Sequence, residues 1–254
     1  MKNMKKIISL ILICLLISNA FAQRRRGTEI KWLSLALKGG YGGNVFLNKD
    51  VLSDPNVKVN YMSPHYVYGG RFGITYGDNI GVNIEPLWST FNQEYSIKGV
   101  TPYTKTQKFK SFDFLVSLRF ISSYGFYLEA GPQFSTLKSA AVTNSISGSF
   151  NEYLNGADYK ENFANKFTSV AFGFGYAAIN GDRVQLFLGL RANYGLGNFV
   201  ENSYFVLGDG FYQQGTYTGA KTSPVSYKLM VELNYFFGFW GDATCGRGRL
   251  MFFQ

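Results

Sequence analysis

The chain has 254 residues, with 25 basic and 16 acidic side chains, one histidine and two cysteines, and 18% of its residues are aromatic. Removal of an export signal would leave Cys245 as the only cysteine, which excludes an intramolecular disulfide. Nucleic acid is a poor partner for an exported basic chain, and anionic lipid headgroups or export-compatible charge explain the basic excess.

Residues 1–22 have the features of a cleaved secretory signal peptide. Three lysines precede an apolar run over residues 7–17, and Ala20-Phe21-Ala22 supplies an A-x-A cleavage site. The apolar run is too short for a membrane anchor. Residues 23–30 then form a basic periplasmic leader. No later segment approaches the roughly 18 consecutive apolar residues of a transmembrane helix.

Eight segments alternate apolar with polar or small residues at the period of a β-strand. They span residues 31–46, 65–76, 80–92, 112–120, 126–134, 170–176, 184–197 and 225–237. The clearest is 184–197, where Leu186, Leu188 and Leu190 share one face and Arg191 lies on the other. A strand of about ten residues with one apolar face suits a tilted crossing of a bilayer. Pro86 predicts a bulge in the third segment, because proline cannot donate to a strand ladder.

The connections between these segments alternate in length. Long loops are predicted over residues 47–64, 93–106, 139–165 and 199–224, and tight turns lie between the other segments. Outer-membrane up-and-down barrels show this asymmetry, with short periplasmic turns and long outer loops. A lipocalin-like barrel would turn the apolar face inward, but the interior of eight strands cannot hold so many Phe, Tyr and Leu side chains. The sequence therefore predicts an all-β, eight-stranded antiparallel transmembrane barrel over residues 31–239 in the cell outer membrane. A periplasmic tail over residues 240–254 would follow.

Nine charged residues fall on the inward-facing parity of the predicted strands. They are Lys38, Arg71, Glu85, Asp113, Arg119, Glu129, Arg191, Lys228 and Glu232. Unpaired charges in a narrow lumen would be costly, so they should pair across strands, Arg191 with Glu129 or Glu232. The set could serve a selective pore or fill the lumen as a polar plug. The small cross-section of eight strands favours the plug.

Catalysis has little support in the sequence. His65 could serve a lipid-modifying hydrolase with a nearby serine such as Ser63, although an ordinary interfacial histidine is the simpler interpretation. One histidine and one remaining cysteine give no zinc-ligand cluster, so neither a metal nor a cofactor is expected. The glycine-rich run at residues 39–43 lies inside a strand, so it is no phosphate loop.

Aromatic residues recur in the predicted loops and could act in two ways. They are Tyr153, Tyr159, Phe163, Tyr204, Phe205, Phe211, Tyr212 and Tyr217. Exposed aromatics suit partner binding. They also suit loops that fold onto the barrel rim. In the tail, Cys245 is either a partner contact or intermolecular disulfide, or a thiol with no partner.

Several short segments resemble the PorT-like outer-membrane β-barrel family. They are LEAGPQ at 128–133, FGFGY at 172–176, LRANYGL at 190–196, LNYF at 233–236 and the pair Glu85-Pro86. The resemblance implies an eight-stranded barrel and, for some members, a part in cargo secretion across the outer membrane or in gliding-type motility machinery. It brings no catalytic residues. The chain departs from the family at residues 112–115, where members often show a proline, and in its tail.

Three functional hypotheses follow. The first is a non-enzymatic barrel that acts as a scaffold or accessory component of an envelope machine, with outer-membrane lipid around it and protein partners at the outer loops or the tail. The second is a loop-displaying adhesin or a small-solute pore. The third is a lipid-modifying enzyme that uses His65.

Overall fold

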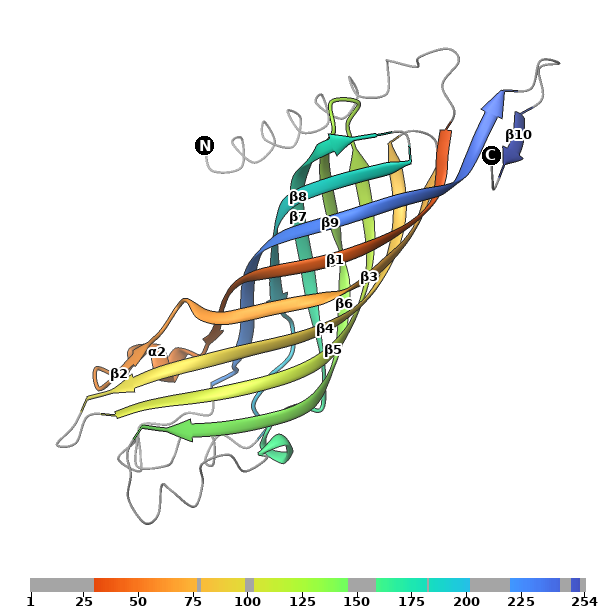
Figure 1. Ribbon diagram of the computed structural model, residues 1–254. Coiled ribbons are helices and arrows are strands. Elements are labelled where there is room, and N and C mark those ends of the chain that lie inside the picture. Colours follow the sequence, from red (N-terminus) through yellow and green to blue (C-terminus); the bar gives the residue numbers. More distant parts are fainter. Residues whose placement is uncertain are drawn as a thin grey trace, which may run out of the picture.

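The computed structural model describes residues 30–76, 79–98, 103–145, 159–181, 183–201, 220–242 and 248–251. Eight long strands form the body of the molecule (Figure 1): β1 (Ile30–Leu47), β3 (Ser63–Tyr76), β4 (Ile80–Ile97), β5 (Tyr103–Ile121), β6 (Phe126–Asn144), β7 (Lys166–Asn180), β8 (Val184–Gly195) and β9 (Ser223–Asp242). The remaining elements are short: α2 (Lys49–Ser53), β2 (Val57–Val59), η1 (Lys160–Asn162) and β10 (Gly248–Met251). The predicted signal peptide, nearly all of the leader and Cys245 lie outside the described residues.

The eight long strands close into a barrel. Each pairs antiparallel with the next along the chain, and β9 returns to pair with β1 over most of its length. Within the barrel wall, closure leaves no unpaired edge, which is the condition for a sheet to cross hydrocarbon. The predicted eight-stranded up-and-down barrel is thus confirmed. None of the helices in the described part of the chain is long and apolar enough to cross a membrane.

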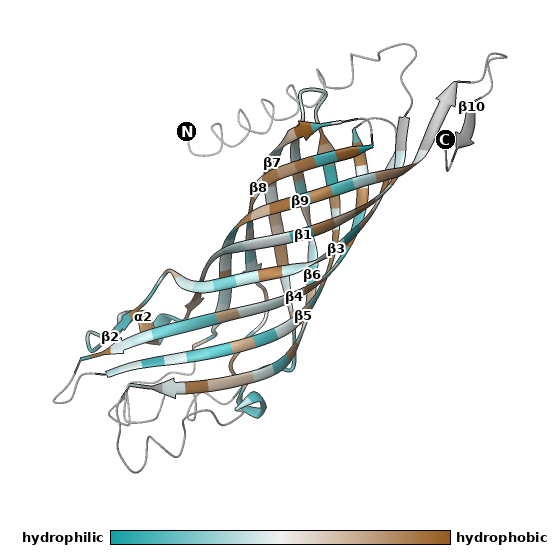
Figure 2. Cartoon of the chain, viewed as in Figure 1, coloured by the Kyte–Doolittle hydropathy of each residue, from teal (hydrophilic) through white to brown (hydrophobic). Residues whose placement is uncertain are grey.

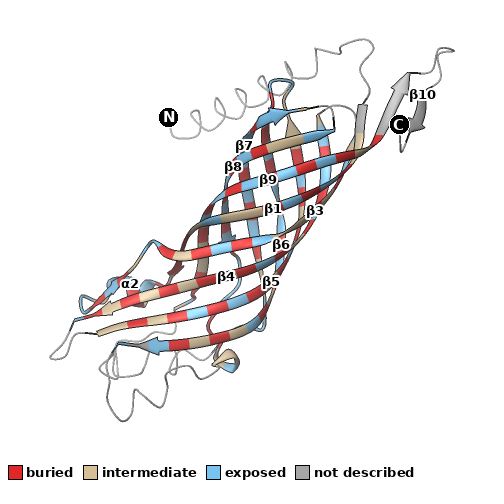
Figure 3. Cartoon of the chain, viewed as in Figure 1, coloured by how far each residue is buried: buried red, intermediate tan, exposed pale blue. Residues whose placement is uncertain are grey.

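The two faces of the wall follow the predicted parity. Buried and exposed residues alternate along every long strand (Figure 3), and the exposed positions include Leu37, Leu118 and Leu190. The inward positions hold small, polar and charged side chains over most of the barrel's height. Because exposed leucine, phenylalanine and valine side chains surround a polar interior, the outer face meets lipid.

The turns at one end of the barrel are short, and we call this the turn end. Three connections there, at residues 77–79, 122–125 and 181–183, join successive strands. The turn at 122–125 depends on Gly125, whose φ of 89° lies in the left-handed region that glycine adopts without strain. The opposite end, which we call the loop end, carries α2, β2 and the connections after β4, β6 and β8.

Two predictions about β4 and its connection to β5 are wrong. Most of the predicted 93–106 loop is strand, because β4 runs to Ile97 and β5 begins at Tyr103. The wall also has no bulge at Pro86. The β3–β4 ladder skips the proline, but Gly69 pairs with Leu87 and Phe72 with Ile84 in one unchanged register. Pro86 has no N–H group, so the ladder loses one hydrogen bond there, but no extra residue is inserted into the strand. Register shifts occur instead on β1, in β6 opposite Lys110 and near the end of β7.

The outer ends of β4, β5 and β6 continue beyond the apolar belt, and we call them, with β2, the projecting sheet. The outward residues of β4 change there from Trp88 to Thr90, Asn92 and Glu94. In Figure 2 the ends of β4 and β5 are correspondingly hydrophilic. β2 pairs with β4 from Val57↔Ile97 to Val59↔Tyr95 and widens the sheet. The predicted 139–165 loop is shortened for the same reason, since β6 extends to Asn144.

At the other end, β9 runs past the predicted end of the barrel. It reaches Asp242, and β10 pairs with it from Gly248↔Asp242 to Met251↔Phe239. Part of the segment predicted as a tail is therefore strand.

Candidate functional site

A network of ion pairs fills the middle of the lumen. Seven of the nine predicted lumen charges belong to it: Lys38, Arg71, Glu85, Arg119, Glu129, Arg191 and Glu232. They come from β1, β3, β4, β5, β6, β8 and β9, and all are buried. Four cations surround three carboxylates. Lys38 Nζ lies 2.9 Å from Glu85 Oε1, 3.1 Å from Glu232 Oε2 and 3.6 Å from Glu129 Oε2.

Arg191 joins two of these carboxylates. Its Nη1 donates to Glu85 Oε2 at 2.8 Å, and its Nε donates to Glu129 Oε1 at 2.9 Å. The expected pairing with Glu129 is present, whereas Glu232 pairs with other cations. Gly173 lies between Glu129 and Arg191 in the strand register. A Cβ at Gly173 would lie 2.7 Å from Glu129 Oε1, so the glycine leaves room for the two charges to meet across β7.

Arg119 joins the network to the turn end of the barrel. Its guanidinium donates from Nη1 and Nη2 to Glu232 at 2.8 and 2.7 Å, a bidentate pair that favours arginine over lysine. It also donates from Nη2 to Glu129 at 2.7 Å. The same guanidinium lies 4.6 Å from the ring centre of Tyr127 and 5.6 Å from that of Phe187. These two rings, packed edge to face, fill the lumen near the turn end.

The other two predicted charges, Asp113 and Lys228, lie apart from the network and nearer the loop end. Asp113 accepts hydrogen bonds from the hydroxyls of Ser89 and Ser111, and Lys228 Nζ donates to Ser226 Oγ at 3.0 Å. Neither makes an ion pair with any residue that the structure describes. Their pairing across strands was expected from the cost of a buried charge; here hydroxyl groups take the place of counter-ions.

His65 faces into the lumen beside these two charges. It is 5% exposed, so the interpretation as an interfacial histidine is wrong, because residue 65 falls on the inward parity of β3. It lines a cavity of about 30 Å³ together with Asp113, Lys228, Ser169 and Asn193. Both ring nitrogens lack a hydrogen-bond partner among the described residues. Ser63 Oγ donates to the backbone oxygen of Asn60, so it is not oriented toward His65.

An aromatic cluster closes the lumen at the loop end, and we call it the aromatic plug. It consists of Phe46, Phe91, Phe109, Phe163 and Phe199. Phe109 is fully buried, with ring centres at 5.1 Å for Phe91 and 4.8 Å for Phe163. The first three rings stand on inward positions of β1, β4 and β5. Sequence reasoning missed the plug because it assigned a polar lumen. The available signal was a single phenylalanine on the polar parity near the outer end of each of these three strands.

The loops contribute the rest of the plug. Phe163 and Phe199 come from the connections after β6 and β8. The two segments are joined by a backbone hydrogen bond, in which Ala164 N–H donates to the Phe199 carbonyl oxygen at 2.9 Å. Phe199 is fully buried between Phe46 and Phe167. Of the loop aromatics predicted to bind partners or fold onto the rim, Phe163 folds inward and Tyr159 packs against the same cluster. The other six lie outside the described residues.

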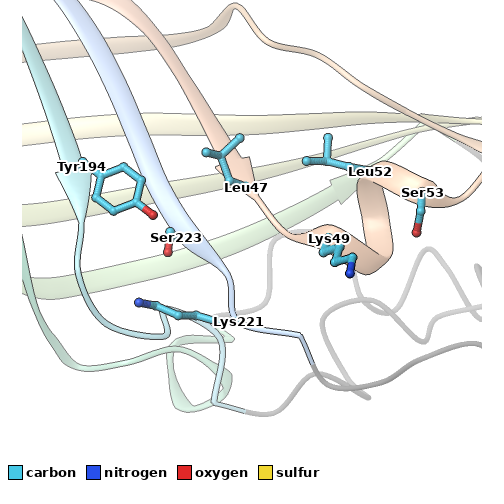
Figure 4. A pocket seen from close by; sticks show the side chains of 7 residues that line it. All are labelled: Leu47, Lys49, Leu52, Ser53, Tyr194, Lys221 and Ser223. Carbon is cyan, nitrogen blue, oxygen red and sulfur yellow. The ribbon is translucent and has the colours of Figure 1, made fainter. Parts of the chain in front are cut away.

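Two open pockets lie at the loop end, outside the lumen. One, of about 540 Å³, is lined by Leu47, Lys49, Leu52, Ser53, Tyr194, Lys221 and Ser223 (Figure 4). The other, of about 470 Å³, is lined by residues of β2 and of the β2–β3 connection and by Glu94 and Ser96 of β4. Within the described residues, no group of three His, Cys, Asp or Glu side chains could hold a metal ion.

Comparison with protein-family models found no match, and comparison with curated proteins found none. Among solved structures, the chain is similar to the outer membrane protein OprG of Pseudomonas aeruginosa, at 10% identity and a TM-score of 0.38 over 84% of this chain and 98% of that one. It is similar to Ail, the attachment invasion locus protein of Yersinia pestis, at 10% identity and 0.40 over 81% and 100%. It is also similar to Neisserial surface protein A, at 13% identity and 0.40 over 81% and 97%.

The strand order and the two faces of the wall define the class of protein. A closed ring of eight antiparallel strands with an apolar outer face and a polar interior is an integral β-barrel of the outer membrane. Its lumen is filled at three heights, by the Tyr127–Phe187 pair, the charge network and the aromatic plug.

Proposed function

We propose that this protein is a non-conducting, non-enzymatic membrane anchor that presents the projecting sheet to a protein partner outside the cell. The observation that carries the proposal is the closed lumen beneath a sheet built from the same strands. In barrels of this class the short turns face the periplasm, which directs the projecting sheet outward. The resemblance to PorT-like barrels gives the setting, an accessory part of a protein secretion or motility machine.

The filled lumen supports an anchor over a pore. Glu85, Arg119 and Arg191 are each at most 2% exposed, and each makes at least two charged contacts across the barrel. Opening a passage would separate buried ion pairs, and losing one partner of such a pair costs about 3–5 kcal/mol. Planar-bilayer recording of the purified chain should therefore show no unit conductance. Stable channels would favour the small-solute pore instead.

The projecting sheet offers a surface suited to protein contact. Tyr61 and Met62, in the connection between β2 and β3 at the base of the projecting sheet, are 57% and 72% exposed, although both are apolar or aromatic. They border the pocket of about 470 Å³ beside Lys58. Aromatic residues and methionine are enriched at protein interfaces. This connection is fixed to the barrel, since Tyr227 Oη donates to the Tyr61 backbone oxygen at 2.8 Å.

Site-specific photo-crosslinking tests this surface. A photoreactive amino acid at Met62 should capture an envelope protein in intact cells. The matched control is Tyr124, which is equally exposed at 72% but lies in a turn at the opposite end. Capture from position 62 and not from 124, of a protein that belongs to an export or motility assembly, is the expected result. Equal capture from both positions would contradict the proposal.

Gene deletion separates the machine component from the adhesin. Loss of cargo export in the deletion strain, restored by the wild-type chain and not by Met62→Asp, is expected for a machine component. Normal export with reduced attachment to surfaces would favour the adhesin. The lipid-modifying alternative requires His65 to reach lipid, and the side chain is instead enclosed in the lumen. A changed lipid profile in a His65→Ala strain would restore that alternative.

A further inference from the structure

Four lysines gather on the outward face of three neighbouring strands, and we call them the lysine band. Lys108 and Lys110 lie on β5, Lys138 on β6 and Lys166 at the start of β7, and all four are exposed. In the described part of the chain, none of them makes an ion pair. The only acidic residues on these strands, Asp113 and Glu129, point into the lumen.

The band lies directly above the apolar belt, on the loop-end side. Lys110 is two residues beyond Phe112 on the same face of β5, and Lys138 is four residues beyond Phe134 on β6. Lys166 precedes Val170 by four residues on β7. At about 3.3 Å per residue, these steps amount to roughly 7–13 Å along tilted strands. This is the height at which lipid headgroups meet the wall.

The lysines are also neighbours across the strands. Lys110 pairs in register with Ser139, the residue after Lys138. Lys166 pairs with Thr136, which is two residues before Lys138. Adjacent strands lie about 4.8 Å apart and diagonal neighbours about 7–8 Å, within reach of flexible lysine side chains. At the same height on β4 the outward residues are the uncharged Thr90 and Asn92, so the lysine band ends at β5 on this side.

We propose that the lysine band binds the phosphate groups of an anionic glycolipid in the outer leaflet. A row of ammonium groups at headgroup height, without acidic neighbours on its own strands, is complementary to phosphate, and each basic residue near a charged lipid surface strengthens binding. Acyl chains of the same lipid would lie on Phe134 and Val170 below. The inference depends on the loop end facing outward and is independent of the proposed machine partner.

Titration with purified lipid A tests the proposal. The full-length protein in neutral detergent micelles is titrated with bisphosphorylated or dephosphorylated lipid A, and bound lipid is counted by native mass spectrometry. We expect the wild-type chain to bind the phosphorylated form at least about tenfold more tightly. The double variant K110Q/K138Q should lose about 30-fold in affinity for it, the effect of two lysines at a charged lipid surface.

The matched control is K58Q/K98Q, which removes two exposed lysines high on the projecting sheet, Lys58 of β2 and Lys98, the residue after β4. These charges lie farther from the headgroups, so affinity should change less than about twofold because salt screens them. K110R/K138R, which keeps the charge, should retain binding. Equal losses in the two glutamine variants, or loss in the arginine variant, would overturn the proposal. Equal binding of the two lipids by the wild-type chain would also overturn the proposal. This comparison uses the wild-type chain alone, so it does not depend on the folding of any variant.

Discussion

The charge network and the aromatic plug fill the same barrel at two heights by opposite chemistry. In the network, directed bonds join side chains of seven wall strands, and each carboxylate faces at least two cations. In the plug, rings from three wall strands pack without directed bonds against rings from two loops. The network therefore links wall to wall, whereas the plug links wall to loops. Substitutions in the two regions should differ in how much they cost and where the damage appears.

The largest effect is expected from Arg191→Leu in the network. It leaves Glu85 and Glu129 buried with fewer partners, which should lower the free energy of unfolding by about 3–5 kcal/mol. Urea unfolding in lipid vesicles, with heat modifiability on gels, measures the loss. Arg191→Lys should retain only part of the stability that Arg191→Leu loses, because one ammonium group cannot reproduce the several fixed donors of the guanidinium. An unchanged unfolding midpoint in Arg191→Leu would mean that water solvates this part of the lumen.

Phe109→Ala in the plug should lower the free energy of unfolding by about 3 kcal/mol, the lower end of the range for truncating a buried phenylalanine to alanine. No charge is left unpaired, so the loss of stability should depend on the apolar volume that is removed. Phe109→Leu, which keeps most of the apolar volume, should therefore cost only about 1 kcal/mol. The same unfolding assay compares both. A loss in Phe109→Leu as large as in Phe109→Ala would show that the plug depends on specific ring geometry.

Phe199→Ala should act mainly on the loops. Its ring joins the β8–β9 connection to the wall, so its removal should release that segment and the neighbouring one around Phe163. Limited trypsin digestion should cleave after Lys160 roughly tenfold faster, equivalent to about 1.4 kcal/mol of easier local opening. Cleavage after Arg183, in a turn at the opposite end, serves as the internal control and should not change. Faster cleavage at both sites would indicate global rather than local loosening.

The smallest effect is expected from His65→Leu, between the two regions. Its ring nitrogens have no partner among the described residues, and its ring centre lies 5.5 Å from that of Phe91. Replacing unpaired polar atoms with an apolar group of similar size should leave stability unchanged or raise it by about 1 kcal/mol. The membrane lipid profile should not change. A marked loss of stability would show that His65 takes part in a polar interaction inside the cavity.

The strand pattern could be predicted along most of the chain because side-chain parity is a local property. Leu186, Leu188 and Arg191 face the predicted sides of β8, since alternation within one strand depends only on the extended backbone. The boundaries at the loop end could not be predicted in the same way. Residues 93–106 are polar in composition and resemble a loop, but pairing between β4 and β5 keeps residues 93–97 and 103–106 in strands. Pro86 is accommodated because its neighbours hold the register on both sides.

The sequence by itself determined the number of strands, which residues face lipid, and which charges enter the lumen, because these follow from a period of two along a single strand. Only the tertiary structure decided that Arg191 meets Glu85, 106 residues away, and that Phe163 and Phe199 seal the loop end. Those contacts depend on the tilt and stagger with which the barrel closes. Stagger is a relation between strands, and no local pattern of residues contains it.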